Sequence, residues 1–110
     1  MATNSFKSRV SSGVGTTFTS IYTTPASTST IMIGLNLACV VTSSITANVQ
    51  IVKSGGSTVY LIKSIPIPTG ASFEVLSGQK IVLETGDQVQ VNCNTASGMD
   101  VIMNFLDITS

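Results

Sequence analysis

Apolar and polar residues alternate along most of this chain, and no window keeps the 3.6-residue period of an amphipathic helix. Alternation with a period of two is typical of a strand with one buried face. Short runs rich in Thr, Val and Ile are separated by Gly, Pro, Ser and Asn, which favour turns. The pattern therefore predicts an all-β protein of about eight strands, at residues 16–22, 29–41, 46–53, 58–63, 72–76, 80–84, 88–94 and 99–108.

The clearest alternation lies in residues 29–41, where we expect the odd-numbered side chains to face the core. Gly34, Asn36 and Ala38 would then lie on the opposite face. The residues predicted to point inward here are Ile31, Ile33, Leu35, Leu37, Cys39 and Val41. In two later strands the predicted inward residues are Val49, Ile51, Val89, Val91 and Cys93.

Two turn signals organise the middle of the chain. Residues 54–57, Ser-Gly-Gly-Ser, predict a hairpin, because glycine takes a positive φ without steric cost. Pro66 and Pro68 cannot donate hydrogen bonds to a neighbouring strand, so residues 65–68 are predicted to be an edge strand or a crossing between sheets. Two antiparallel sheets packed face to face in a jelly-roll-like order satisfy this pattern most simply.

The glycines at 13 and 15 divide the chain into two predicted parts, an N-terminal arm at residues 1–15 and a β-sandwich domain at residues 16–110. The arm is rich in serine, and its only large apolar residues are Phe6 and Val10. A polar segment of this kind is ordered only by contacts with its own domain or with a partner.

The last predicted strand is apolar on both faces. Val101, Met103 and Phe105 share one face, whereas Ile102, Leu106 and Ile108 share the other. Such a strand is either covered by protein on both sides or lies at a subunit contact, and near the chain end we favour the contact. The candidate partner-binding residues are therefore Phe6, Lys7, Arg9, Val10, Ile102, Leu106 and Ile108.

Charge is scarce, at 9% of residues against about 25% in an average protein. With a formal net charge of zero, the chain has little electrostatic protection from self-association, so we expect a homo-oligomer. Four of the five basic residues precede residue 70, and all five acidic residues follow it. Folding could mix these charges on one surface, or a basic edge of one subunit could meet an acidic edge of the next.

The residue types that most enzymes and metal sites need are missing or few. There is no histidine, and Cys39 and Cys93 occupy inward positions where buried thiols are favoured over a disulfide. Glu84 and Asp87 could in principle form a hydrolytic carboxylate pair, but in this Gly-containing turn we expect Asp87 to bind backbone amides. We therefore predict no enzymatic activity, no metal and no cofactor.

Composition also argues against several partners. Five basic residues give no footprint for nucleic acid, and the longest apolar stretch is too short and too interrupted to cross a membrane. The N-terminus has no apolar segment of the kind that a secretory signal carries. Tyr22 and Tyr60 are the candidates for stacking on a glycan, although each is predicted to be a rim residue with its hydroxyl in water.

One stretch of the chain resembles a known family. Residues 65–91, IPIPTGASFEVLSGQKIVLETGDQVQV, look like small all-β virion structural proteins of tailed bacteriophages, particularly those that infect marine cyanobacteria. The resemblance extends to YTTPASTSTIMIGLNLACV at 22–40 and to DVIMNFLDI at 100–108. Its motifs are structural, so it implies no active-site residues.

The resemblance implies a virion component assembled in many copies in the host cytoplasm. Its partners would be the major capsid protein or other virion proteins. We expect a capsid decoration (cement) protein that binds capsomers through edge strands and the N-terminal arm. The alternative is a tail, neck or fibre component, which could act as a module that binds host glycans.

Overall fold

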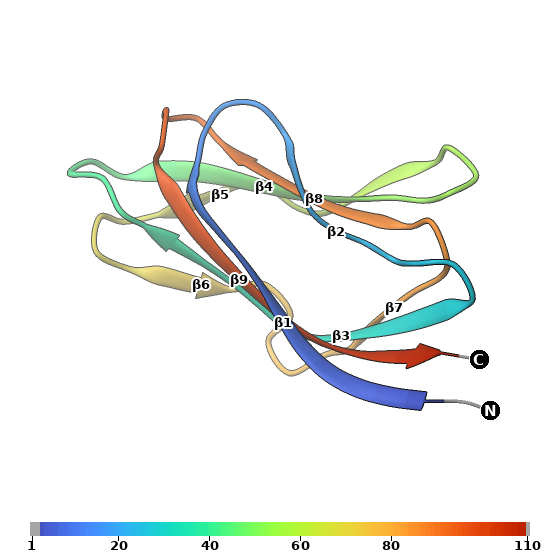
Figure 1. Ribbon diagram of the computed structural model, residues 1–110. Helices are drawn as coiled ribbons and strands as arrows, with labels where there is room; N and C mark the ends of the chain where they lie inside the picture. The colour runs from blue at the N-terminus through green and yellow to red at the C-terminus, as the bar shows by residue number, and fades with distance from the viewer. Residues whose placement is uncertain (1–2, 110) are drawn as a thin grey trace.

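The computed structural model describes residues 3–109, which form nine strands in two layers (Figure 1). The strands are β1 (Thr3–Val14), β2 (Thr19–Thr23), β3 (Thr28–Cys39), β4 (Ile45–Val52), β5 (Thr58–Ile67), β6 (Ser72–Glu74), β7 (Ile81–Leu83), β8 (Gln88–Cys93) and β9 (Met99–Thr109). No helix among the described residues is long and apolar enough to cross a membrane.

The two layers are antiparallel sheets that face each other. The first sheet has the order β1-β9-β3-β6, with β7 also paired to β3, and the second has the order β2-β8-β4-β5. The chain passes repeatedly from one sheet to the other, and apart from the β4–β5 hairpin the neighbours in each sheet are distant in sequence, as in a jelly roll. The structure thus confirms the predicted all-β, two-sheet jelly-roll sandwich.

The predicted arm lies within this sandwich. Residues 3–14 form β1, which pairs antiparallel with β9 from Thr3 opposite Thr109 to Val14 opposite Met99. The structure therefore has one strand more than the sequence pattern indicated. Residues 1–2 of the predicted arm and residue 110 of the predicted domain lie outside the described residues.

A β-bulge in β3 corrects the predicted inward face of this strand. The pairing with β9 shifts between Met32 and Gly34, so one extra residue lies on the β3 side. Leu35 is fully buried as predicted, but Met32 replaces Ile31 and Ile33 in the core, and Ile33 is exposed. Because side chains alternate with a period of two, one extra residue exchanges the two faces of the strand before the bulge.

The core fills the space between the sheets. The inward residues predicted for β4 and β8 are confirmed as buried: Val49, Ile51, Val89, Val91 and Cys93. Cys39 and Cys93 are both buried free thiols. Residues 65–67 of the proline-containing segment belong to β5, which is an edge strand of the second sheet. Of the two predicted alternatives, an edge strand or a crossing between sheets, the structure shows the first.

Candidate interaction surface

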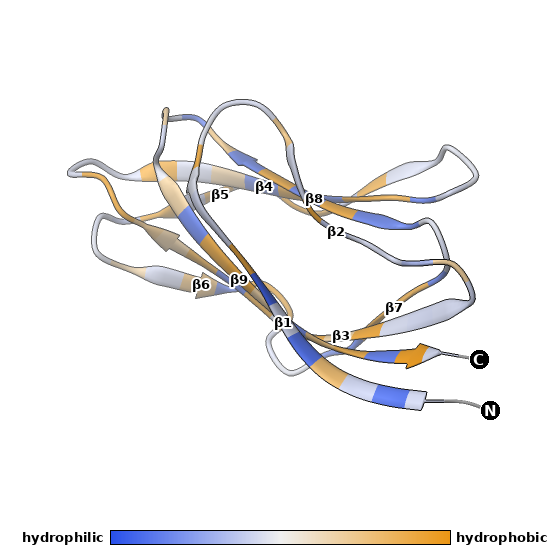
Figure 2. Cartoon of the chain, in the orientation of Figure 1, coloured by the Kyte–Doolittle hydropathy of each residue, from blue (hydrophilic) through white to orange (hydrophobic). Residues whose placement is uncertain are grey.

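The edge strand β1 presents two different faces. Phe6 and Val10 lie opposite Leu106 and Ile102 of β9 and point away from the second sheet. Their exposed fractions are 77% and 73%, although both are large apolar side chains. Along β1 these apolar bands alternate with polar ones (Figure 2). We call the face of the first sheet that is turned away from the second sheet the outer face.

An apolar row crosses the outer face from one side of the first sheet to the other. Phe6 pairs with Leu106, Leu106 pairs with Ile31, and Ile31 pairs with Val82 of β7. Val82 is 61% exposed, and Leu106 and Ile31 are partly exposed. Cross-strand partners project to the same side of a sheet, so these four side chains form one continuous apolar ridge open to the surroundings. We call them the apolar row.

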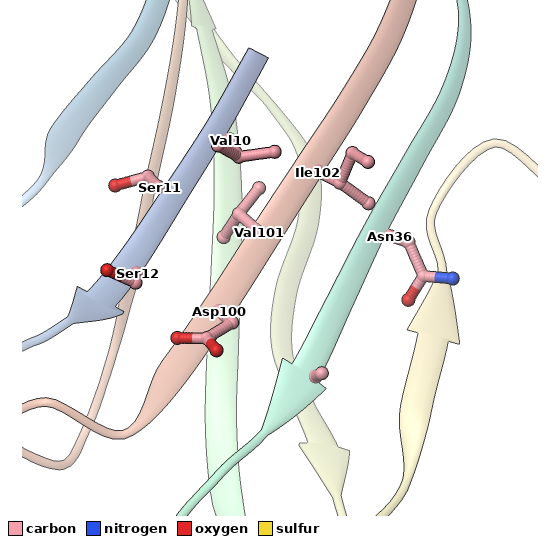
Figure 3. Close-up of a pocket in the computed structure, with 8 residues that line it drawn as sticks. Val10, Ser11, Ser12, Asn36, Asp100, Val101 and Ile102 are labelled. Carbon is pink, nitrogen blue, oxygen red and sulfur yellow. The ribbon is translucent and has the colours of Figure 1, made fainter. Parts of the chain in front are cut away.

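Four residues further along the strands, the same face is hollowed. Val10 lies beside Ile102, and Ile102 pairs with Asn36 (Figure 3). Together with Ala38 and Asp100 they line most of a hollow of about 360 Å³. We call it the hollow. Its position follows from the small side chain of Ala38 and from the register shift of β1 after Ser11, where β1 departs from β9.

The carboxylates on this face are already bound within the chain. Asp100 accepts a hydrogen bond from the Gly13 amide at 3.0 Å. Glu74 accepts bonds from the amides of Leu35 and Leu76, at 3.0 and 3.2 Å. Backbone dipoles thereby partly compensate the negative charge of both carboxylates. The rest of the outer face combines apolar side chains with uncharged polar ones such as Asn36 and Asn104.

The structure divides the seven predicted partner-binding residues between two faces. Phe6, Val10, Ile102, Leu106 and Ile108 belong to the outer face, because each pairs with an outward residue of a neighbouring strand. Lys7 and Arg9 lie opposite Phe105 and Met103, and so point to the side of the core. Ile31 and Val82 also belong to the outer face but were not predicted there, and the alternation of β3 gave no signal of the bulge that turns Ile31 outward.

Lys7 and Arg9 contact their own domain. The Lys7 ammonium lies 3.5 Å from the buried carboxylate of Asp107, and the Arg9 guanidinium lies 5.4 Å from the centre of the Tyr22 ring. Asp107 also accepts hydrogen bonds from the hydroxyls of Tyr22 and Thr30. This network joins β1, β2, β3 and β9 and so fastens β1 to the sandwich.

The network corrects the prediction for Tyr22, which is buried rather than a rim residue with a hydrated hydroxyl. Burial, reinforced by the neighbouring Asp107, raises the pKa of Tyr22 to about 12. Burial alone would raise the pKa of Asp107, but the bonds from Tyr22 and Thr30 and the Lys7 charge outweigh it and hold that pKa below its usual value. Tyr60 is exposed, as predicted.

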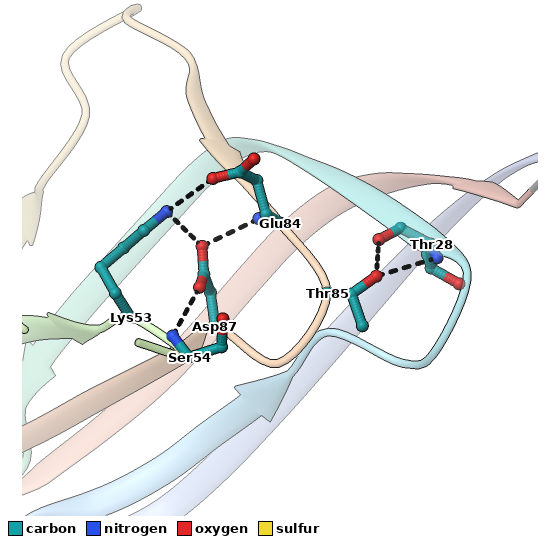
Figure 4. Close-up of polar contacts among 6 residues, drawn as sticks. All are labelled: Thr28, Lys53, Ser54, Glu84, Thr85 and Asp87. Carbon is teal, nitrogen blue, oxygen red and sulfur yellow. Dashed lines mark hydrogen bonds and ion pairs between the residues drawn. The ribbon is translucent and has the colours of Figure 1, made fainter. Parts of the chain in front are cut away.

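The carboxylate pair considered from sequence, Glu84 and Asp87, belongs to a structural turn. Asp87 has no exposed surface and accepts bonds from the amides of Ser54 and Glu84 and from the Lys53 ammonium (Figure 4). This confirms that Asp87 binds backbone amides. Burial tends to raise the pKa of Asp87, yet the Lys53 charge and both amides lower it overall. A carboxylate committed in this way offers no open position for a substrate.

Three ion pairs within the domain support the first of the two interpretations of the uneven charge distribution. Lys7 pairs with Asp107, and Lys53 pairs with Glu84 and Asp87, so early bases meet late acids inside one domain. Among residues 3–109 there is no group of three or more His, Cys, Asp or Glu that could hold a metal ion.

Comparison with known proteins relates this chain to others by fold. No protein-family model matches the sequence, and no curated protein matches it significantly. The structure is similar to a chain of the Bacillus endospore appendages, which form disulfide-linked pili, with a TM-score of 0.55 and 18% identity over 98% of this chain and 88% of that chain.

Chains of viral particles match this structure with similar TM-scores. A chain of infectious bursal disease virus, Gx strain, matches with a TM-score of 0.56 and 11% identity, over 99% of this chain and 33% of that chain. A chain of the VP2 subviral particle of the same virus matches with a TM-score of 0.52 and 10% identity, over 98% of this chain and 32% of that chain. The present chain thus spans about a third of the length of these viral proteins. At such identities the likeness concerns the fold alone.

Proposed function

We propose that this chain is a non-enzymatic structural protein of a bacteriophage virion, and above all a capsid decoration protein. It would be built into the particle in many copies through the outer face and the free edge of β1. The apolar row carries this proposal, because contiguous exposed apolar side chains are typical of protein–protein contact sites.

Two further findings support the proposal. The fold is similar to chains of spore pili and of a virus particle, and in both cases the β-sandwich belongs to a large assembly. The sequence of residues 65–91 resembles virion proteins of tailed phages. These findings are independent of the apolar row, which depends on side chains rather than on backbone likeness.

The edge of β1 suggests how a capsid protein would be held. Within residues 3–109, β1 pairs with β9 on one side only, and its other side has no strand partner in this chain. Unpaired amides and carbonyls along an edge recruit an extended segment of another chain by β-augmentation. The contacts of Lys7 and Arg9 keep β1 in place, so its outer edge is presented as a fixed template.

The test is the location and copy number of the protein on virions whose genome encodes it. Quantitative mass spectrometry should find it in numbers comparable with those of the major capsid protein, and gold-labelled copies should lie on the head. A location confined to the tail, or a copy number far below that of the capsid protein, would contradict the decoration role and favour the tail or fibre alternative.

A matched pair of variants tests whether incorporation into the virion depends on the outer face. Phe6→Asp places a charge on the outer face, and we expect at least a tenfold loss of copies per virion. Val59→Asp is the control, because Val59 is 53% exposed on β5 of the other sheet, and its incorporation should not change. Equal incorporation of both variants would contradict the role of the outer face.

A further inference from the structure

The outer face carries both a projecting side chain, Phe6 of the apolar row, and a hollow that could receive it. Phe6 and Val10 are four residues apart on β1, which corresponds to about 13 Å along a strand. Phe6 projects at one end of this interval, and the hollow beside Val10 lies at the other end (Figure 3). An apolar cavity of about 150 Å³ already admits a benzene ring, so a hollow of about 360 Å³ has room for a phenylalanine side chain.

A two-fold axis can bring these two features together on two copies of the chain. The residues midway between them form the row Ser8, Asn104 and Gly34. A rotation by 180° about an axis that runs along this row, across the strands, places the outer faces of two copies against each other. It lays Phe6 of each copy over the Val10 end of the other, and Leu106 over Ile102.

We propose that the outer face is the contact of an isologous homodimer, in which Phe6 of each copy enters the hollow of the other. Such a contact is self-complementary, as closed two-fold symmetry requires. The dimer resembles the packing of two sheets within a sandwich, with inner side chains interdigitating. This inference deepens the proposed function and rests on it only in treating the outer face as an interaction surface.

Electrostatics does not oppose contact between identical faces. Lys7 and Arg9 of β1 point inward, and the carboxylates of Glu74 and Asp100 are bound to backbone amides. The chain has a formal net charge of zero, so two copies approach without long-range repulsion. A strongly charged partner would find no complementary group at the apolar row, whereas Val10 and Ile102 of a second copy would exclude water from it.

The size of the face fits a dimer contact. Strands of 11 or 12 residues rise about 3.3 Å per residue and lie about 4.8 Å apart, so β1, β9 and β3 present a face of roughly 36 by 14 Å. Two such faces together cover about 1,000 Å², which is the lower bound for a specific protein interface. The free edge of β1 remains available for a capsid protein.

The first experiment measures association in solution. Sedimentation equilibrium of the purified chain at micromolar to millimolar concentration should give twice the monomer mass of 11.4 kDa. Phe6→Asp should weaken dimerisation at least a hundredfold, whereas Val59→Asp should leave it unchanged. Circular dichroism and thermal unfolding establish that each variant is folded. A wild-type chain that is monomeric at millimolar concentration overturns the proposal, as does a dimer insensitive to Phe6→Asp.

An exchange of size between projection and hollow tests the geometry. Phe6→Ala removes the projection and Val10→Phe fills the end of the hollow that faces it, so each should weaken the dimer at least tenfold. Combined in one chain, the larger side chain at 10 meets the space left at 6 of the other copy, and at least half of the lost affinity, on a logarithmic scale, should return. Additive losses in the double variant would overturn the two-fold arrangement.

The two proposals can fail separately. A chain that dimerises through the outer face but is missing from virions contradicts the proposed function and leaves the dimer intact. A chain that is abundant on virions but monomeric in solution, with Phe6→Asp lost from the particle, assigns the outer face to a capsid protein and overturns the dimer.

Discussion

Gly86, in the turn between β7 and β8, occupies a position that only glycine fills without strain. Its φ is +89°, and an added Cβ would lie 2.7 Å from the Cβ of Ser54. Both effects act at once, because the left-handed backbone disfavours a side chain and the hairpin after β4 leaves no space for one. The close approach also brings the Ser54 amide to Asp87.

Gly86→Ala should therefore destabilise the fold by about 2–4 kcal/mol, since backbone strain and a steric clash add. Gly70→Ala is the matched control. Gly70 also has a positive φ, of +76°, but nothing lies within 4 Å of an added Cβ, so only strain of about 1–2 kcal/mol is expected. Urea unfolding measures both. Equal losses for the two variants would show that the clash with Ser54 is relieved without cost.

The hydroxyl of Tyr22 is predicted to control stability in alkali. An acid whose pKa is higher in the folded than in the unfolded chain contributes fully below the unfolded value, here about 10. That contribution is lost as the pH rises toward the folded pKa of about 12. In a Tyr60→Phe background, the phenolate absorbance of Tyr22 should rise near pH 12. A midpoint near pH 10 would mean that the hydroxyl is not buried against Asp107.

At the scale of single elements, the bulge in β3 decides which side chains support the core. Leu35 lies beyond the bulge and is fully buried, whereas Ile33 lies within it and is exposed. Leu35→Ala should cost about 2–5 kcal/mol because it leaves a cavity between the sheets. Ile33→Ala should cost less than about 1 kcal/mol. Chemical denaturation compares them, and similar losses would place the bulge elsewhere in β3.

The strand β1 should be the least stable part of the first sheet. Most of its side chains are exposed, and it is held by pairing with β9 and by the contacts of Lys7 and Arg9. Native-state hydrogen exchange should show protected amides in β1 that open at lower free energy than those of β3 and β9. Exchange of all β1 amides at the rate of an unfolded peptide would instead describe a free arm.

For the whole molecule, two buried carboxylates connect the basic first part of the chain with its acidic second part. Asp107 binds Lys7, and Asp87 binds Lys53, and both carboxylates have a lowered pKa in the fold. A group of this kind contributes stability above its unfolded pKa of about 4 and loses it as the pH falls through the lower folded value.

The free energy of unfolding should therefore fall steeply below about pH 4, and Asp107→Asn should reduce the slope. Unfolding by urea at a series of pH values between neutral and strongly acidic gives both slopes. Asp100→Asn is the control, because Asp100 is not fully buried and has one backbone bond at the edge of the hollow. An unchanged slope in Asp107→Asn would place the acid sensitivity elsewhere.

Most strand positions, the 54–57 hairpin turn and the inward faces of β4 and β8 could be predicted because they depend on local preferences and on a period of two. The doubly apolar character of β9 and the binding of backbone amides by Asp87 were visible for the same reason. Each of these features is a property of a few consecutive residues.

The tertiary structure alone decided the rest. Whether residues 3–14 form an arm or a strand depends on pairing with β9, almost a hundred positions away in sequence. The bulge that turns Ile31 outward shifts the register by one residue without a change in composition, and burial of Tyr22 requires four strands to meet at Asp107. The apolar row exists only because β1, β9, β3 and β7 lie side by side in the first sheet, and no local sequence pattern specifies this pairing.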